Sequence, residues 1–233
     1  EVIDVLAVLL ALIISFLHGV TVTEDEITVA HCAETGRILS QMHNTAKDFE
    51  PVRANTMGMA AWRNLFKKTK DRADEVEDGL AVLINSELVF LHDAMPEGLP
   101  RCVIHADLFP DNVFFEGSHI SGVIDFYFSC SGFMAYDLAL TLNAWCFNGD
   151  GAPDEEKLAA LLESYQDGRM LKPEEKQAFS VLCRAAALRI LMTRLHDWLF
   201  HDPENIVQPK DPREYIKILR YHRQKDPHHT TYI

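Results

Sequence analysis

The sequence predicts an α+β fold that is predominantly α, arranged around one short β-hairpin. Two apolar runs, at residues 113–115 and 123–124, are joined by the turn-rich linker E-G-S-H-I-S-G, a pattern typical of two paired strands. Long stretches on both sides repeat apolar residues at helical spacing. A chain of 233 residues that is 48% hydrophobic can bury a large core, which helices around a small sheet would supply.

Composition narrows the classes of function. The formal net charge of −13 disfavours nucleic acid or an anionic membrane as the main partner, because both would repel the chain. It is compatible with a metal-bound nucleotide, since Mg²⁺ supplies local positive charge. Five cysteines without a C-x-x-C pair are typical of free thiols in a reducing compartment. The apolar run at residues 5–14 is too short to cross a bilayer comfortably, and Glu1 and Asp4 precede it where a secretory signal would carry positive charge. We therefore expect a buried element in a cytoplasmic protein, with a signal anchor as the alternative.

The elements before the hairpin alternate between apolar patterns and breakers. In order, we expect a strand near residues 12–16, helices over residues 23–44, 57–71 and 81–92, and a short strand at residues 103–104. Thr23 and the acids after it suit a helix start through capping and the helix dipole. We interpret His31 and His43 as surface or edge residues of that first helix. The segment P-E-G-L-P at residues 96–100 ends the third helix.

The elements after the hairpin are all expected to be helical. In order, they cover residues 135–146, 154–165, 173–200 and 213–223, with Asp154 and Pro173 at two of the starts. Asp137 lies within the strongly apolar first of these helices, where a buried carboxylate needs hydrogen-bond donors. The long third helix holds three interior arginines spaced five apart, Arg184, Arg189 and Arg194.

The residues that carry chemistry surround the hairpin. The segment H-A-D-L-F-P-D-N at residues 105–112 has the spacing of a kinase catalytic loop, with Asp107 followed five residues on by Asn112. Asp107 can accept the proton of an attacking hydroxyl, or hold that hydroxyl in line with a phosphorus atom. Asn112 and Asp125 stand at the entrance and exit of the hairpin, where their oxygens can bind Mg²⁺. Asp125 alone is equally compatible with a turn residue at a strand end.

Three motifs together resemble one family. The chain has H-x-D at His105 and Asp107, I-D-F at residues 124–126 and D-L-A at residues 137–139. In this order they resemble the aminoglycoside-phosphotransferase and choline-kinase branch of the protein-kinase-like fold. The resemblance extends from about Leu12 to Arg223. It implies the C-terminal lobe of that fold and ATP- and Mg-dependent phosphoryl transfer to a hydroxyl of a small molecule.

The resemblance also implies a role for each matching residue. Asp107 corresponds to the catalytic base, and Asn112 and Asp125 correspond to the metal ligands. His105 and Asp137 are expected to be structural and to brace the catalytic loop by hydrogen bonds. The hinge, whose backbone contacts adenine, corresponds to Ile14, Ser15, Phe16 and Leu17.

The sequence around these motifs is similar to that of the bacterial homoserine kinases of that family, as in the segments G-V-I-D-F-Y-F and L-N-A-W-C-F. This implies L-homoserine as substrate and a place in threonine biosynthesis. Arg194 is the best candidate for binding a substrate carboxylate. An ion pair of Arg194 with Asp197 or Asp137 is an equal alternative. Weaker substrate candidates, each more typical of a core position, are Tyr127, Asn143 and Trp198.

One departure from the family concerns the N-terminal lobe. The chain has no G-x-G-x-x-G motif and no lysine before Lys47, so residues 1–18 are expected to be a remnant of that lobe and residues 19–233 the helical lobe. A fragment or a naturally truncated copy is therefore expected. Other hydroxyl kinases of the fold, for methylthioribose, choline or aminoglycosides, and a catalytically inactive fragment remain alternative interpretations.

Overall fold

The computed structural model describes residues 17–202, 204 and 208–225, and within them the chain is mostly helical. The expected strand near residues 12–16 lies outside the described residues. The predominantly helical α+β class is confirmed. The α-helices are α1 (Val29–Ala46), α2 (Met59–Thr69), α3 (Leu80–Ala94), α4 (Met134–Trp145), α5 (Glu155–Gly168), α6 (Pro173–Leu199) and α7 (Arg213–Gln224).

In the described part of the chain, four short strands form two antiparallel pairs. The predicted hairpin is confirmed as β2 (Val113–Glu116) and β3 (His119–Val123), although β3 begins earlier than the apolar run that predicted it. The second pair joins β1 (Arg101–Ile104) to β4 (Cys130–Phe133). Strand β4 was not predicted, because its sequence C-S-G-F is partly polar, contains glycine and lacks a strand pattern. Its strand conformation comes from pairing with β1 rather than from a local pattern.

The chain that enters the described region lies against the hairpin. Val20 and Phe115 exchange two backbone hydrogen bonds, of 3.0 and 2.8 Å. Gly19 has a φ of +102°, and a Cβ placed there would lie 2.5 Å from the carbonyl oxygen of Phe115, so a side chain would clash. The Leu17 side chain packs over Gly122 of β3, where a Cβ would lie 2.5 Å from Leu17 Cδ1. These contacts fix the entering segment beside the hairpin.

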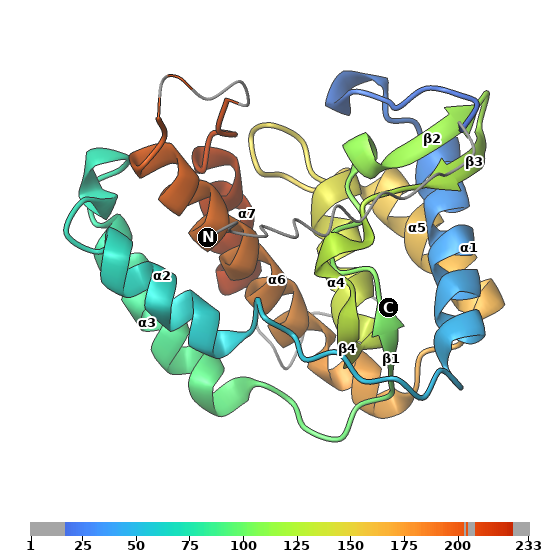
Figure 1. Ribbon diagram of the computed structural model, residues 1–233, viewed down its shortest axis with the longest axis horizontal. Coiled ribbons are helices and arrows are strands. Elements are labelled where there is room, and N and C mark those ends of the chain that lie inside the picture. The colour runs from blue at the N-terminus through green and yellow to red at the C-terminus, as the bar shows by residue number, and fades with distance from the viewer. Residues whose placement is uncertain (1–16, 203, 205–207, 226–233) are drawn as a thin grey trace, which may run out of the picture.

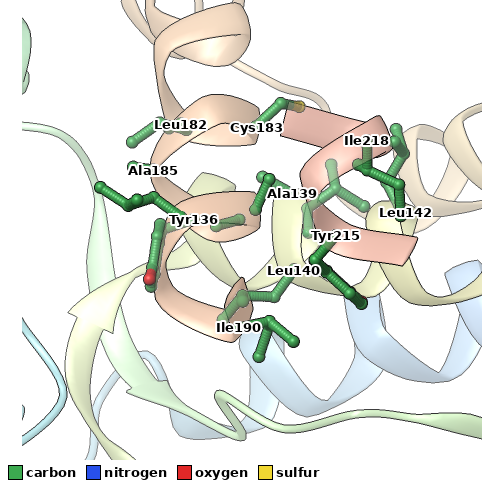
Figure 2. Close-up of a cluster of buried hydrophobic side chains, with 14 of the residues drawn as sticks. Tyr136, Ala139, Leu140, Leu142, Leu182, Cys183, Ala185, Ile190, Tyr215 and Ile218 are labelled. Carbon is green, nitrogen blue, oxygen red and sulfur yellow. The ribbon is translucent and has the colours of Figure 1, made fainter. Parts of the chain in front are cut away.

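The core is centred on α6. This helix packs against α2, α3, α4 and α7, as the central position of α6 in Figure 1 illustrates. Figure 2 shows side chains of α4, α6 and α7 interdigitating, among them Leu140, Leu142, Leu182, Ile190, Tyr215 and Ile218. Burial on this scale provides the main stabilisation, at about 25 cal/mol per Å² of apolar surface. It also makes α6 a rigid base for the groups that it carries.

Helices α1 and α5 approach unusually closely at one side of the molecule (Figure 1). A Cβ on Gly36 of α1 would lie 2.2 Å from the carbonyl oxygen of Leu161 in α5, so only glycine permits this approach. The first helix also begins later than expected. Thr28, rather than Thr23, caps α1, because the acids after Thr23 form a separate 3₁₀ turn, Glu24–Glu26.

The five cysteines and His43 are buried. All five cysteines are buried free thiols, as the sequence predicted. The surface interpretation of His43 is wrong, since its side chain is 1% exposed and bonded to buried partners. Among the described residues, no helix combines the length and apolar character needed to cross a bilayer.

Candidate active site

The loop after β1 is held in a strained conformation by a buried carboxylate. Ala106 has a φ of 63°, in the left-handed region that non-glycine residues rarely adopt. Asp137 of α4 accepts hydrogen bonds from the backbone N–H groups of His105 and Ala106, at 2.8 and 2.7 Å. Such strain costs about 1–3 kcal/mol, and the charge-assisted hydrogen bonds offset it.

Asp137 is itself held by a buried chain of polar side chains. His43 of α1 lies 3.1 Å from Asp137 through Nε2 and 2.8 Å from the Tyr165 hydroxyl through Nδ1. Tyr165 accepts from Arg169, which pairs with the buried Glu175. Burial alone would raise the pKa of Asp137, but the hydrogen bond and charge of His43 and the backbone donor lower it below its usual value. Asp137 therefore carries the negative charge that its donors require.

His105 connects the loop to the far end of the hairpin. Its Nδ1 accepts from the backbone N–H of Asp107 at 3.2 Å, so Nε2 carries the proton and donates to the carbonyl oxygen of Ile124 at 3.0 Å. The ring is 1% exposed and lies 4.8 Å from the Phe126 ring, centroid to centroid. These contacts fix the position of Asp107 relative to Asp125, the residue after Ile124.

Asp107 lies beside a buried arginine of α6. Arg189 Nη2 is 3.6 Å from Asp107 Oδ1, and Nη1 of the same guanidinium donates to the carbonyl oxygen of Ala106. Arg189 also lies over the Phe128 ring, 5.2 Å from its centroid. Burial raises the pKa of Asp107, and the positive charge of Arg189 opposes that rise. Arg189 therefore supports an ionised carboxylate at this position.

Asn112 and Asp125 present oxygen atoms to the same region. The Asn112 Nδ2 group donates to the Asp107 carbonyl at 2.9 Å, which turns the amide oxygen away from the loop. Asn112 O accepts from Ile124 N at 3.0 Å, so the two ends of the hairpin are tied together. Asp125 has a φ of 63°, a second strained position, and its Oδ1 accepts from Tyr127 N at 3.3 Å. An amide oxygen and a carboxylate are hard donors that fit Mg²⁺, which takes its other ligands from phosphates and water.

A cavity of about 210 Å³ brings the three side chains together. Asp107, Asn112 and Asp125 line it. The remaining lining residues come from the catalytic loop, from α6 and from the segment before α7, and are Phe109, Asp111, Ile190, Thr193, Arg194 and Lys210. The volume lies below the about 300–1,000 Å³ typical of sites for drug-sized ligands, so the cavity suits a small molecule.

The substrate candidates are placed differently from one another. Arg194 lines the cavity and pairs with Glu214 of α7, so neither of the two ion-pair partners considered from the sequence is correct. Asn143 is 2% exposed and bonds to Cys183 O and His222, which makes it a core residue outside the described cavity lining.

The other binding candidates lie at the surface or outside the described chain. Tyr127 is 70% exposed on the turn after Asp125, and Trp198 is 38% exposed near the Arg213 guanidinium. Neither is among the described residues that line the cavity. Of the hinge candidates, Leu17 lies beside the hairpin, whereas Ile14, Ser15 and Phe16 lie outside the described residues.

Several residues in or beside the cavity are not assigned to the site by the sequence. Arg189 and Lys210 are 83 and 99 residues from the loop groups that they contact, Ala106 and Asp111. The one available signal was an arginine within an apolar helix, which usually has a defined anionic partner. Lys210 and Glu214 belong to polar segments that carry no such signal.

The sequence matches the phosphotransferase enzyme family over residues 2–171. A homoserine kinase of Rhizobium etli is 51% identical over 214 residues, which cover 92% of this chain and 66% of that protein. A choline kinase of Cryptosporidium parvum aligns over 90% of this chain and 68% of its own, with a TM-score of 0.64 and 14% identity. An aminoglycoside phosphotransferase of Alicyclobacillus acidocaldarius aligns over 90% of this chain and 69% of its own, with a TM-score of 0.59 and 15% identity. The two structural likenesses concern the fold alone.

Proposed function

The chain belongs to the phosphotransferase enzyme family, and on that premise we propose that it transfers the γ-phosphoryl group of ATP to the hydroxyl of L-homoserine. The observation that carries phosphoryl transfer is the convergence of Asp107, Asn112 and Asp125 on one cavity of about 210 Å³. The choice of acceptor is supported by 51% identity to the R. etli homoserine kinase over 92% of this chain. The chain spans 66% of the length of that relative, so the activity is proposed for the protein as a whole.

In this proposal, Asp107 accepts the proton of the acceptor hydroxyl or holds the hydroxyl in line with the γ-phosphorus. Its ionised form is supported by the Arg189 guanidinium 3.6 Å away. Asp107 is oriented through its backbone, because its N–H donates to the buried His105 ring at 3.2 Å. Positioning of this kind is the main contribution that a protein makes to phosphoryl transfer.

Asn112 and Asp125 would hold Mg²⁺ through the amide oxygen and the carboxylate. The hydrogen bond from Asn112 Nδ2 to Asp107 O supports this role, because it leaves the amide oxygen available. When bound, the metal would neutralise charge on the phosphate oxygens. The strained backbone of Asp125, with a φ of 63°, supports a functional role, since such strain is found preferentially at active sites.

The acceptor is tested with a panel of hydroxyl compounds. We expect ADP release with Mg·ATP and L-homoserine, and at most slow release with choline, methylthioribose or an aminoglycoside. Turnover of choline or an aminoglycoside without turnover of homoserine would overturn the acceptor but keep the reaction class. Absence of turnover with every acceptor, despite calorimetric binding of Mg·ATP, would count against the reaction itself.

A further inference from the structure

Two ion pairs lie at the cavity over Asp107. Arg194 of α6 pairs with Glu214 of α7. Lys210 pairs with Asp111 of the catalytic loop at 2.7 Å. Arg194, Lys210 and Asp111 all line the cavity that contains Asp107. The lining of this cavity therefore includes two positive groups and the paired Asp111, and Glu214 pairs with Arg194.

The Arg194 guanidinium has N–H donors that form no hydrogen bond to a described residue. Both of its hydrogen bonds to described residues, to Asp211 O and to Glu214, use Nη1. Its Nε and Nη2 groups form the edge that binds a carboxylate with two parallel hydrogen bonds, and this edge has no partner among the described residues. The ring of Tyr215, 4.5 Å from the guanidinium, supports one face of the group. Arg194 is 9% exposed, so a carboxylate bound there would be largely desolvated.

Arg194 and Lys210 stand where three cavities meet. Besides the cavity of about 210 Å³ over Asp107, they line neighbouring cavities of about 420 and 440 Å³. Both residues are therefore accessible to a small molecule in any of the three cavities. Because each of the two cations is paired with a carboxylate, this region offers both a positive and a negative group to an acceptor rather than a field of one sign.

We propose that these residues form a receptor for a zwitterionic α-amino acid, in which Arg194 binds the carboxylate and Asp111 binds the ammonium. The proposal rests on the proposed function in one respect, namely that the acceptor hydroxyl lies at Asp107. Ile190 supplies an apolar wall for the methylene groups between the hydroxyl and the charged end. Asp111 and Lys210 are 58% and 56% exposed at their side chains, so the ammonium end contributes less than the carboxylate end.

Isothermal titration calorimetry on the full chain tests the proposal with three ligands. L-homoserine carries both charged groups, 3-amino-1-propanol lacks the carboxylate, and 4-hydroxybutanoate lacks the ammonium. A hydrogen-bonded carboxylate at a desolvated arginine corresponds to roughly a tenfold to hundredfold difference in affinity. We therefore expect 3-amino-1-propanol to bind at least about tenfold more weakly than homoserine, and 4-hydroxybutanoate to lose about twofold to fivefold.

Substitutions then assign each charged group. Arg194→Met should reduce the affinity for homoserine to that for 3-amino-1-propanol and leave the latter unchanged, with partial recovery in Arg194→Lys. Asp111→Asn should weaken homoserine but not 4-hydroxybutanoate. The matched control is Arg220→Met on α7, whose arginine pairs with Glu77 and is not among the described residues lining the three cavities.

Equal affinity of the unaltered chain for homoserine and 3-amino-1-propanol would overturn the proposal, and this comparison needs no variant to fold. Equal losses of affinity for homoserine and 3-amino-1-propanol in Arg194→Met would also overturn it. Carboxylate-dependent binding without phosphate transfer to homoserine would keep the receptor and refute the proposed function. Transfer to homoserine that is insensitive to Arg194→Met and Arg194→Lys would refute the receptor alone.

Discussion

Asp137→Asn tests whether the catalytic loop depends on the buried carboxylate behind it. Three donors point at Asp137: the backbone N–H groups of His105 and Ala106, and Nε2 of His43. An asparagine of the same size has one acceptor oxygen, and its NH₂ group must face at least one of these donors. The substitution therefore leaves buried donors unpaired without creating a cavity.

The expected loss of stability follows from these contacts. Hydrogen bonds to a charged group contribute about 1.5–3 kcal/mol each, and removal of one partner of a buried ion pair costs about 3–5 kcal/mol. Because the three contacts share one carboxylate, they are not additive, and we expect a loss of about 3–5 kcal/mol in the free energy of unfolding. This is a large part of the about 5–15 kcal/mol typical of a folded domain.

Urea unfolding followed by circular dichroism at pH 7 measures this loss. The control is Asp167→Asn, an exposed carboxylate on α5, for which we expect a change within about 0.5 kcal/mol. The pKa of Asp137 is lowered in the folded state, so its contribution is complete above the unfolded value and is lost as pH falls through the folded value. The difference between the two proteins should therefore shrink in acid. A loss below about 1 kcal/mol at pH 7 would refute the reasoning.

Three further predictions concern buried ionisable groups. Arg189→Met removes the guanidinium beside Asp107 and should lower kcat at least about tenfold with nucleotide affinity nearly unchanged, as steady-state kinetics and calorimetry would reveal. Glu87→Gln breaks a bidentate pair with Arg184, at 2.6 and 3.1 Å, and should cost about 3–5 kcal/mol in urea unfolding; an unchanged midpoint would contradict this. Burial lowers the pKa of His222 in the folded protein to about 3. The neutral imidazole therefore contributes its full stabilisation above its pKa in the unfolded chain, about 6.5, and this contribution is lost as pH falls below that value. Acidification to pH 5 should then remove about 2 kcal/mol of stability, and His222→Gln should flatten that slope.

The sequence predicted the elements that local patterns determine. The hairpin, the helices and the buried thiols follow from apolar spacing and turn residues. The family resemblance implied that Asp137 braces the loop, and its apolar helical setting supported this; its contacts with His105 and Ala106 have that form. These expectations depended on short segments whose chemistry is evident without the rest of the fold.

Contacts between distant segments could not be predicted in this way. From the sequence, His43 was interpreted as a surface or edge residue, because its partner Asp137 lies 94 residues away. The contact forms only when α1 and α4 pack together. Neither ion-pair alternative for Arg194 included Glu214, because that residue belongs to a helix whose position relative to α6 has no local signal. Strand β4 has a weak pattern of its own and depends on pairing with β1. In each case the missing information was the tertiary arrangement rather than the residue type.

Phosphorus NMR of a reaction with Mg·ATP and L-homoserine tests the central claim most directly. We expect one phosphomonoester to form in step with ADP. Asp107→Asn should slow its formation by at least about a hundredfold while nucleotide affinity changes by less than about threefold. Formation of the phosphomonoester at a comparable rate in Asp107→Asn, or equal losses of rate and nucleotide affinity, would contradict the role of Asp107 as the base.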